Sequence, residues 1–395
     1  MNLSLSYFAD QFVFWNLKKI SYGYLELNDS KGSKYCFGNK NSLLNTNIKI
    51  NDPSFTLKLL KQGSSGLGES YMNNEFETND LPSLIELSAR NINVTYKFSG
   101  LLKMPFIQNV LNKLILTNTR ERSKRNISAH YDLGNEFFSV WLDKTLTYSC
   151  GIFNSNDETL EKAQINKYNK LIDLIKPKPG NKILEIGCGW GGFAEQVAKN
   201  YDVKLDCITI SKKQFEYTRA KINKLGLNHK VNVQMLDYRD VRKKYDNIVS
   251  IEMIEAVGEK YLKSYFKSIK ENLVIGGRAA IQSIVINDNL YDRYRTKEDF
   301  IQKFIFPGGF LPSLKSLKKL SSNSGLLLDS QKLYGDHYSN TLQKWRKSFL
   351  NSWDQISRQG FNTSFKKMWD FYLSYCEAGF KSKNIDLIQF SLCRK

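Results

Sequence analysis

The sequence predicts an α/β fold with a doubly wound, mostly parallel sheet, and two observations carry this prediction. The first is an apolar strand that runs into a glycine-rich loop, KILEIGCGWGGF at residues 182–193. The second is the regular alternation of strand-like and helix-like segments that follows the loop. Such alternation is typical of βαβ units, which build parallel sheets.

The elements of the sheet can be assigned in order along the chain. Expected strands cover residues 182–186, 204–210, 231–236, 246–252 and 277–286. One helix is expected to begin after Gly192, and two more are expected at 211–224 and 259–272. Two later strand-like segments, 326–333 and 385–392, can pair antiparallel at the edge of the sheet. The sequence therefore predicts a mostly parallel, seven-stranded sheet with an antiparallel edge strand.

The N-terminal part predicts a smaller α+β domain over residues 1–100. Strand-like segments lie at 22–27 and 48–50, followed by a glycine-rich turn, GSSGLGES (63–70), and a helix at 81–90. Residues 101–128 are expected to form a basic linker helix with Lys103, Lys113, Arg120, Arg122, Lys124 and Arg125. Such a charged face is as consistent with simple solvation as with lipid headgroups. Residues 129–395 are expected to form the larger domain.

Composition predicts a globular protein with an acidic partner. The 395 residues are 41% hydrophobic, and 58 Lys and Arg against 39 Asp and Glu give a formal net charge of +19. A positive excess of this size favours nucleic acid or an anionic membrane surface. No segment has the ~18 uninterrupted apolar residues of a membrane-spanning helix, and the N-terminus lacks the basic start of a signal peptide.

The cysteines and histidines predict neither a disulfide framework nor a metal site. The six cysteines are scattered without a C-x-x-C pair, so reduced thiols in the cytoplasm are expected. The three histidines and their neighbours show no metal-ligand spacing.

The glycine loop predicts a nucleotide-like cofactor. Glycines permit positive φ and close backbone approach, and the following helix N-terminus offers unpaired N–H groups. Gly187, Gly189 and Gly191 alternate after Glu185, which differs from the G-x-G-x-x-G pattern that holds a pyrophosphate. Because an acid would repel phosphate, S-adenosylmethionine fits better than NAD, although a structural turn is the simpler alternative.

The second and third strands suggest where the rest of this cofactor lies. The second strand ends in Thr209 and Ser211 rather than in the carboxylate that usually binds a ribose. Asp237, after the third strand, is placed for the adenine end, and Tyr238 can stack there. The alternative for Asp237 is an ordinary helix cap.

Several segments occur together and in a fixed order along the chain. They are HYDLGNEFFSVWLDKTLTYSCGIF (130–153), the glycine loop, IEMIEAVGEKYLKSYF (251–266), FIFPGGFLPS (304–313), HYSNTLQKWRKSF (337–349) and FYLSYCEAGF (371–380). Over roughly residues 125–395 the chain resembles the cyclopropane-fatty-acyl-phospholipid synthase family, and GLGESYMNNEF (66–76) suggests the family's N-terminal domain. The resemblance implies a Rossmann-like class I methyltransferase fold. It also implies transfer of a methylene group from S-adenosylmethionine to a cis double bond of a membrane phospholipid.

The resemblance also implies the site residues. It assigns the cofactor to Tyr148, Ser149, Gly187, Gly189, Thr209, Gln214, Tyr238 and Arg239. It further implies a bicarbonate ion as the catalytic base, held by Cys150, Glu255, Gln282, the backbone of Ile284, and Tyr338. Several bacterial members carry histidine where this chain has Gln282, which can donate a hydrogen bond but cannot titrate.

Without the resemblance, these residues have simpler interpretations. Cys150 fits a small buried filler, Glu255 a carboxylate at a helix start, and Tyr338 a half-buried amphipathic tyrosine.

Alternative functions stay open at this point. A fatty-acyl C-methyltransferase would give a methylene- or methyl-branched chain from the same cation. A nucleic-acid methyltransferase would fit the charge, but the fourth strand is followed by IEMIEAVG rather than N-P-P-Y, so no nucleic-acid partner is expected. The expected partner is an anionic phospholipid bilayer that the protein meets peripherally at the inner face of the membrane. The family also suggests a homodimer.

Overall fold

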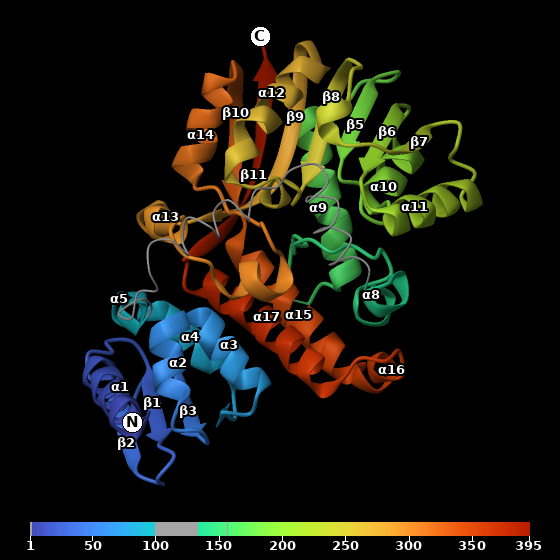
Figure 1. Cartoon of the computed structure of the whole chain (residues 1–395). Helices are drawn as coiled ribbons and strands as arrows, with labels where there is room; N and C mark the ends of the chain where they lie inside the picture. Colours follow the sequence, from blue (N-terminus) through green and yellow to red (C-terminus); the bar gives the residue numbers. More distant parts are fainter. Residues whose placement is uncertain (1, 99–132, 156) are drawn as a thin grey trace. The chain divides into compact units, whose positions relative to one another are not determined.

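The computed structural model describes residues 2–98, 133–155 and 157–395, which divide into two compact units (Figure 1). The first unit combines the N-terminal segment with Arg293–Pro307 and Leu350–Asn384. The second contains the described residues from 133 to Asp292, together with Gly308–Phe349 and Ile385–Lys395. The expected linker helix at 101–128 lies outside the described residues.

The second unit is built on a sheet of seven strands in the order β10-β11-β9-β8-β5-β6-β7. Their bounds are β5 Lys182–Ile186, β6 Lys204–Thr209, β7 Val231–Met235, β8 Tyr245–Ile251, β9 Leu273–Ile286, β10 Leu326–Leu333 and β11 Ile385–Arg394. Strands β7, β6, β5, β8 and β9 are parallel, whereas β11 is antiparallel to both β9 and β10. The predicted α/β sheet is confirmed, with its antiparallel strand one place inside the edge that β10 forms.

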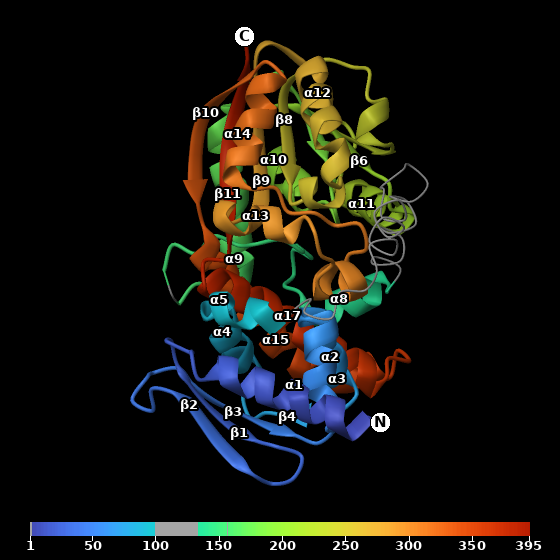
Figure 2. The same ribbon diagram turned by 60° about the vertical axis from the view of Figure 1, so that its left-hand side comes forward.

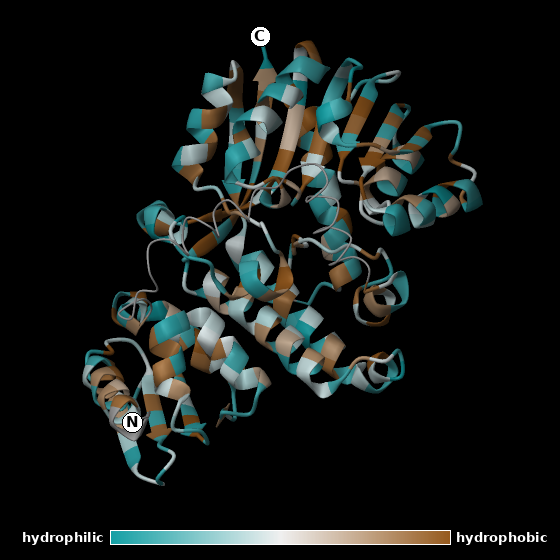
Figure 3. Cartoon of the chain, in the orientation of Figure 1, coloured by the Kyte–Doolittle hydropathy of each residue, from teal (hydrophilic) through white to brown (hydrophobic). Residues whose placement is uncertain are grey.

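Helices cover both faces of this sheet. The helices of the second unit are α8 Asn135–Trp141, α9 Leu160–Ile175, α10 Gly192–Asn200, α11 Lys212–Lys224, α12 Leu262–Asn272, α13 Asp288–Tyr294, α14 Leu314–Asn323 and α15 Gly335–Asn351. Helices α9 and α10 lie on one face and α12 and α14 on the other (Figure 2). The strands are largely hydrophobic (Figure 3) because a parallel sheet covered on both faces buries both sets of side chains.

The first unit contains a sheet of four strands in the order β2-β1-β3-β4. The strands are β1 Tyr24–Asn28, β2 Lys34–Gly38, β3 Asn45–Ile50 and β4 Phe76–Glu77. The helices are α1 Asn2–Leu17, α2 Phe55–Gln62, α3 Ser64–Met72, α4 Leu81–Arg90, α5 Ile92–Thr95, α16 Trp353–Ser357 and α17 Thr363–Lys381. The strands expected near residues 22–27 and 48–50 and the helix expected at 81–90 are confirmed.

The glycine-rich turn expected at 63–70 is wrong, because these residues form most of helix α3. Gly63, at φ 57°, separates α2 from α3, and the later glycines serve packing. A Cβ on Gly66 would lie 2.6 Å from the Lys58 carbonyl oxygen, and one on Gly68 would lie 2.2 Å from the Phe300 ring. The glycines therefore allow close approach of neighbouring elements rather than breaking the chain.

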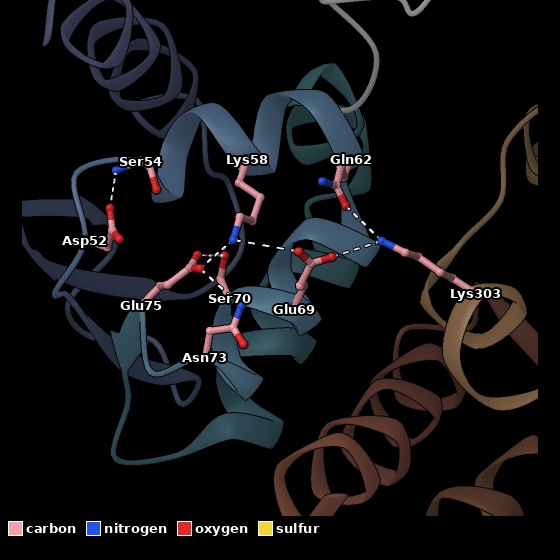
Figure 4. A network of polar contacts seen from close by, with 9 residues as sticks. All are labelled: Asp52, Ser54, Lys58, Gln62, Glu69, Ser70, Asn73, Glu75 and Lys303. Carbon is pink, nitrogen blue, oxygen red and sulfur yellow. Dashed lines mark hydrogen bonds and ion pairs between the residues drawn. The ribbon is translucent and has the colours of Figure 1, made fainter. Parts of the chain in front are cut away.

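A polar network joins residues 293–307 to the N-terminal segment within the first unit (Figure 4). The Lys303 ammonium donates to Glu69 at 2.9 Å and to the Gln62 side-chain oxygen at 3.1 Å. On the other side of Glu69, Lys58 forms ion pairs with Glu69 at 3.9 Å and with Glu75. A segment distant in sequence thus belongs to the N-terminal unit.

Candidate active site

The glycine loop begins where β5 ends and leads into α10. Gly187, Gly189 and Gly191 have φ values of 84°, 52° and 77°, the left-handed region that favours glycine. A Cβ on Gly191 would lie 2.7 Å from the Thr218 methyl carbon, and one on Gly187 would lie 3.0 Å from Met253 Cγ. The loop is therefore a cradle with bare backbone, which fits the close approach of a nucleoside-type cofactor.

The predicted cofactor residues of the next strand are buried together. The Thr209 hydroxyl donates to the side-chain oxygen of Gln214 at 2.9 Å. The Ser211 hydroxyl accepts from the Gln214 backbone N–H at 3.4 Å and caps α11. This fixes the side chain of Gln214 at the carboxyl end of β6.

Asp237 caps a short 3-10 turn at Tyr238–Asp240, as the alternative interpretation proposed. Its carboxylate accepts from the Arg239 backbone N–H at 2.9 Å and from the guanidinium at 2.8 and 2.6 Å. The ring of Tyr238 meets that of Tyr265 edge-on at 5.6 Å, and burial raises the pKa of Tyr238 to about 12. Contact of these residues with adenine stays a prediction.

Glu185 lies inside the unit, beneath the loop. Its carboxyl accepts a hydrogen bond from the Cys207 thiol at 3.3 Å, and burial raises its pKa to about 8. Nearby, the buried Lys167 of α9 donates to the Ser149 hydroxyl at 2.7 Å, and burial lowers its pKa to about 8. Sequence reasoning missed Lys167, since a lysine within an amphipathic helix gives no sign that it is buried.

Tyr148 is part of a cluster of aromatic rings. Its ring centroid lies 5.2 Å from that of Phe138, 5.7 Å from that of Trp141 and 5.3 Å from that of Trp345. Helices α8 and α15 supply these partners. The ring faces form an apolar wall, of the kind that can stabilise a developing cation.

Three of the predicted catalytic residues converge on a carboxylate that the sequence analysis did not select, that of Glu252. The Cys150 backbone N–H and the Gln282 amide donate to its Oε1 at 2.9 and 2.7 Å. The Tyr338 hydroxyl donates to its Oε2 at 2.5 Å. Burial raises the pKa of Glu252, and these hydrogen bonds oppose the rise.

Glu255 forms a second carboxyl site beside the first. Its Oε1 accepts from the Ile284 backbone N–H at 2.5 Å, whereas its buried Oε2 makes no hydrogen bond to any residue in the described ranges. Burial and the charge of Glu252 raise the pKa of Glu255 to about 8. At neutral pH Glu255 is therefore mostly a carboxylic acid with a hydroxyl to donate.

The tertiary structure thus brings the five predicted catalytic residues together: Glu255 is one of two neighbouring acids, and the other four donate hydrogen bonds to Glu255 or to Glu252. The signal for Glu252 was present in IEMIEAVG, where two acids three residues apart follow the end of β8. Ligands in open α/β sheets bind at this carboxyl edge. Glu252 also has φ 50°, a conformation unusual for a residue other than glycine.

The cysteine at this site has an inert thiol. Cys150 is completely buried, and its Sγ contacts the Gly151 carbonyl oxygen at 3.1 Å and the Thr341 hydroxyl at 3.8 Å. Burial and the charge of Glu252 raise the thiol pKa, so no thiolate nucleophile is expected. Among the described residues, no group of three or more potential ligands could hold a metal ion.

Comparison with known proteins gives the site a chemical context. The model of a family described as mycolic acid cyclopropane synthetase matches residues 118–390. Tuberculostearic acid methyltransferase of Mycobacterium tuberculosis is 34% identical over 343 residues, 85% of this chain and 80% of the relative. Cyclopropane-fatty-acyl-phospholipid synthase of Escherichia coli K12 is 32% identical over 350 residues, 88% of this chain and 87% of the relative.

Solved structures agree with these matches. The cyclopropane synthase MmaA2 of M. tuberculosis superposes with a TM-score of 0.65 at 27% identity, covering 69% of this chain and 98% of that one. Mycolic acid cyclopropane synthase CmaA1, solved with SAH and CTAB, gives a TM-score of 0.65 at 27% identity over 68% of this chain and 97% of that one. The SAH in the second structure supports S-adenosylmethionine as the cofactor.

Proposed function

The chain belongs to the mycolic acid cyclopropane synthetase family and is an S-adenosylmethionine-dependent methyltransferase, and on this premise we propose that it builds a cyclopropane ring into an unsaturated phospholipid acyl chain. Family membership supports the coarser function, which is transfer of a methylene group to a lipid acyl chain. The phospholipid substrate and the ring product are the proposal.

The observation that carries the proposal is a carboxylate held by several donors next to the cofactor loop. Met253, which follows Glu252, lies against Gly187 of the loop. A proton acceptor therefore lies beside the segment that would hold the methyl donor. Ring closure needs such an acceptor, because one proton must leave the transferred methyl group.

The residues of the chain have separable tasks in this reaction. Bound S-adenosylmethionine would supply an electrophilic methyl group. The glycine loop, Thr209 and Gln214 would hold it, and the aromatic wall around Tyr148 would exclude water and stabilise a carbocation. The family resemblance implies a bound bicarbonate as the base, and the donors that it would need are the residues that converge on the two acids.

A branching fatty-acyl methyltransferase is the second candidate. The tuberculostearic acid methyltransferase is about as similar to the chain as the cyclopropane synthase is, at 34% against 32% identity. The ring forms when the methyl carbon loses a proton as it closes onto the cation, whereas branching follows a hydride shift or loss of a proton from a neighbouring chain carbon, so the position of the base helps to decide between them.

The test is to incubate the protein with S-adenosylmethionine and vesicles of a cis-monounsaturated phospholipid. We expect a product that is one CH₂ heavier, has lost its double bond and shows cyclopropane protons by NMR. The same mass with retained unsaturation would overturn the ring product in favour of branching.

We further propose that the protein binds anionic bilayers peripherally through α1. The side chains of Leu5, Phe8 and Trp15 are exposed on this helix, the last two at 69% and 57%. The Lys19 ammonium lies 3.0 Å from the centre of the Trp15 ring. Lys19 follows the end of the helix at Leu17, so exposed apolar side chains lie next to a basic one, as is typical of interfacial binding. No helix in the described ranges is long and apolar enough to cross a membrane.

Vesicle co-sedimentation tests this docking surface. We expect binding to phosphatidylglycerol vesicles that falls about tenfold or more in Phe8→Ala and Trp15→Ala, because each removes roughly 1.5–3 kcal/mol of burial. Leu43→Ala is the matched control, since Leu43 is fully exposed and does not belong to α1. Equal losses in all three variants would contradict a role specific to α1.

A further inference from the structure

We propose that the carboxylate of Glu252 is itself the base that removes the proton from the transferred methyl group, in place of a bound bicarbonate. The inference rests on the proposed function and identifies a catalytic residue for it.

The hydrogen-bond donors carry the argument. A bicarbonate held as the family resemblance implies would need the donors at positions 150, 282, 284 and 338. In this structure Cys150 N–H, the Gln282 amide and the Tyr338 hydroxyl already donate to Glu252. The Ile284 N–H donates to Glu255. Two carboxyl groups of the chain thus satisfy the donors that the ion would require.

A second glutamine, Gln389, fixes the orientation of the Gln282 side chain. The side-chain oxygen of Gln282 accepts from Gln389 at 2.8 Å, which fixes the amide orientation. Its NH₂ group therefore points toward Glu252 at 2.7 Å, with a longer contact to the Cys150 carbonyl oxygen at 3.4 Å. The fixed amide therefore has its NH₂ group directed at the Glu252 carboxylate, which is always present in the site.

The backbone at Glu252 is consistent with a functional placement. The left-handed conformation of Glu252, at φ 50°, destabilises the folded chain by about 1–3 kcal/mol, and it persists only where the surrounding structure enforces it. Glu252 keeps partial exposure, whereas Cys150 and Gln282 are buried. Glu252 is thus less enclosed than these two donors.

The surrounding charges suit a carboxylate that accepts a proton. Burial raises the pKa of Glu252, which strengthens it as a base, while the three hydrogen bonds favour its ionised form. The adjacent Glu255, with a pKa of about 8, is largely neutral and does not compete for the negative charge.

The proposed step balances. As the bond from sulfur to the methyl carbon breaks, the alkene electrons form the first new C–C bond, and the neutral thioether leaves. A carbocation remains on the other alkene carbon. The electrons of one methyl C–H bond then form the second C–C bond, and the proton passes to a Glu252 oxygen.

Removal of bicarbonate separates the two bases directly. The wild-type protein would be assayed in buffer purged of carbon dioxide, with and without added bicarbonate. We expect turnover to be unchanged by either treatment. A loss of activity on purging that bicarbonate restores would overturn the inference.

Two variants of Glu252 complete the test. Glu252→Gln removes the base and keeps the shape, so we expect turnover to fall by about 10²–10⁴-fold. Glu252→Gly removes the side chain and the strain of a positive φ, and it leaves the three hydrogen-bond donors free to bind a small anion. Added formate or bicarbonate should therefore restore the activity of this variant at least about tenfold. Glu271→Gln, on the exposed side of α12, is the control and should match wild type.

Calorimetric titration with S-adenosylmethionine shows whether each variant is folded. A Glu252→Gly variant that binds the cofactor but is not restored by either anion would give Glu252 a structural role and overturn the inference. A wild-type protein that binds the cofactor yet modifies no lipid would instead contradict the proposed function.

Discussion

The Tyr338 hydroxyl donates to Glu252 Oε2 at 2.5 Å, although 86 residues separate the two in the chain. The bond stabilises the ionised form of the carboxylate and so lowers its pKa against the effect of burial.

Loss of this hydroxyl should change the pH dependence of catalysis. The base acts when deprotonated, so activity falls on the acidic side as pH drops through its pKa. Tyr338→Phe removes a stabilising donor and should move that limb to higher pH by about one unit, equivalent to ~1.4 kcal/mol. Profiles of kcat against pH with saturating cofactor measure the shift. Tyr334→Phe, four residues earlier, is the control, and equal profiles for both variants would contradict the assignment.

A second acid at position 282 should disable the site. Gln282→Glu replaces the donor 2.7 Å from Glu252 with a like charge, so the two carboxyls would share a proton and base strength would be lost. We expect turnover to fall at least about 100-fold, which is the contribution of a general base. The control is Gln196→Glu, on α10 away from the acids. Activity close to wild type would show that Gln282 does not position Glu252.

The glycine cradle can be tested at Gly191. Gly191→Ala combines strain at φ 77° with a Cβ 2.7 Å from Thr218, so the loop must shift and cofactor affinity should fall about tenfold or more. Gly226→Ala, at φ 68° with no atom within 4 Å of its Cβ, adds strain alone. Calorimetry should therefore give a weaker Kd for the first variant only. Equal Kd values would remove the loop from the cofactor site.

Glu185 should make stability depend on pH. Its pKa of about 8 in the folded state lies above that of the unfolded chain, so the folded protein binds the extra proton. Its contribution is complete below about pH 4.5 and is lost as pH rises to about 8, by at most ~1.4 kcal/mol per unit. Glu185→Gln should therefore gain stability relative to wild type over this range. Thermal unfolding at pH 5, 7 and 9 checks this, and a constant difference would contradict it.

The sheet was predictable because its signal is local. Strand β5 is a buried apolar run that ends at the glycine loop, and it has the bounds expected from sequence alone. Strand β10 also has its expected bounds, although it is an exposed strand at the edge of the sheet. The α3 helix was not predictable in this way. Its glycines suggested a turn, but close packing against Phe300 in the folded unit decides their role.

The sequence by itself determined the order of the strands along the chain and the glycine loop, and its resemblance to a known family predicted five residues at the catalytic site. Only the tertiary structure decided that three of them donate to Glu252 and one to Glu255. It also decided that residues 293–307 and 350–384 fold with the N-terminal unit. The physical reason is that hydropathy periodicity reports neighbours along the chain. The partner of a hydrogen bond depends instead on strand order and helix packing, which bring positions 150, 252, 282 and 338 together.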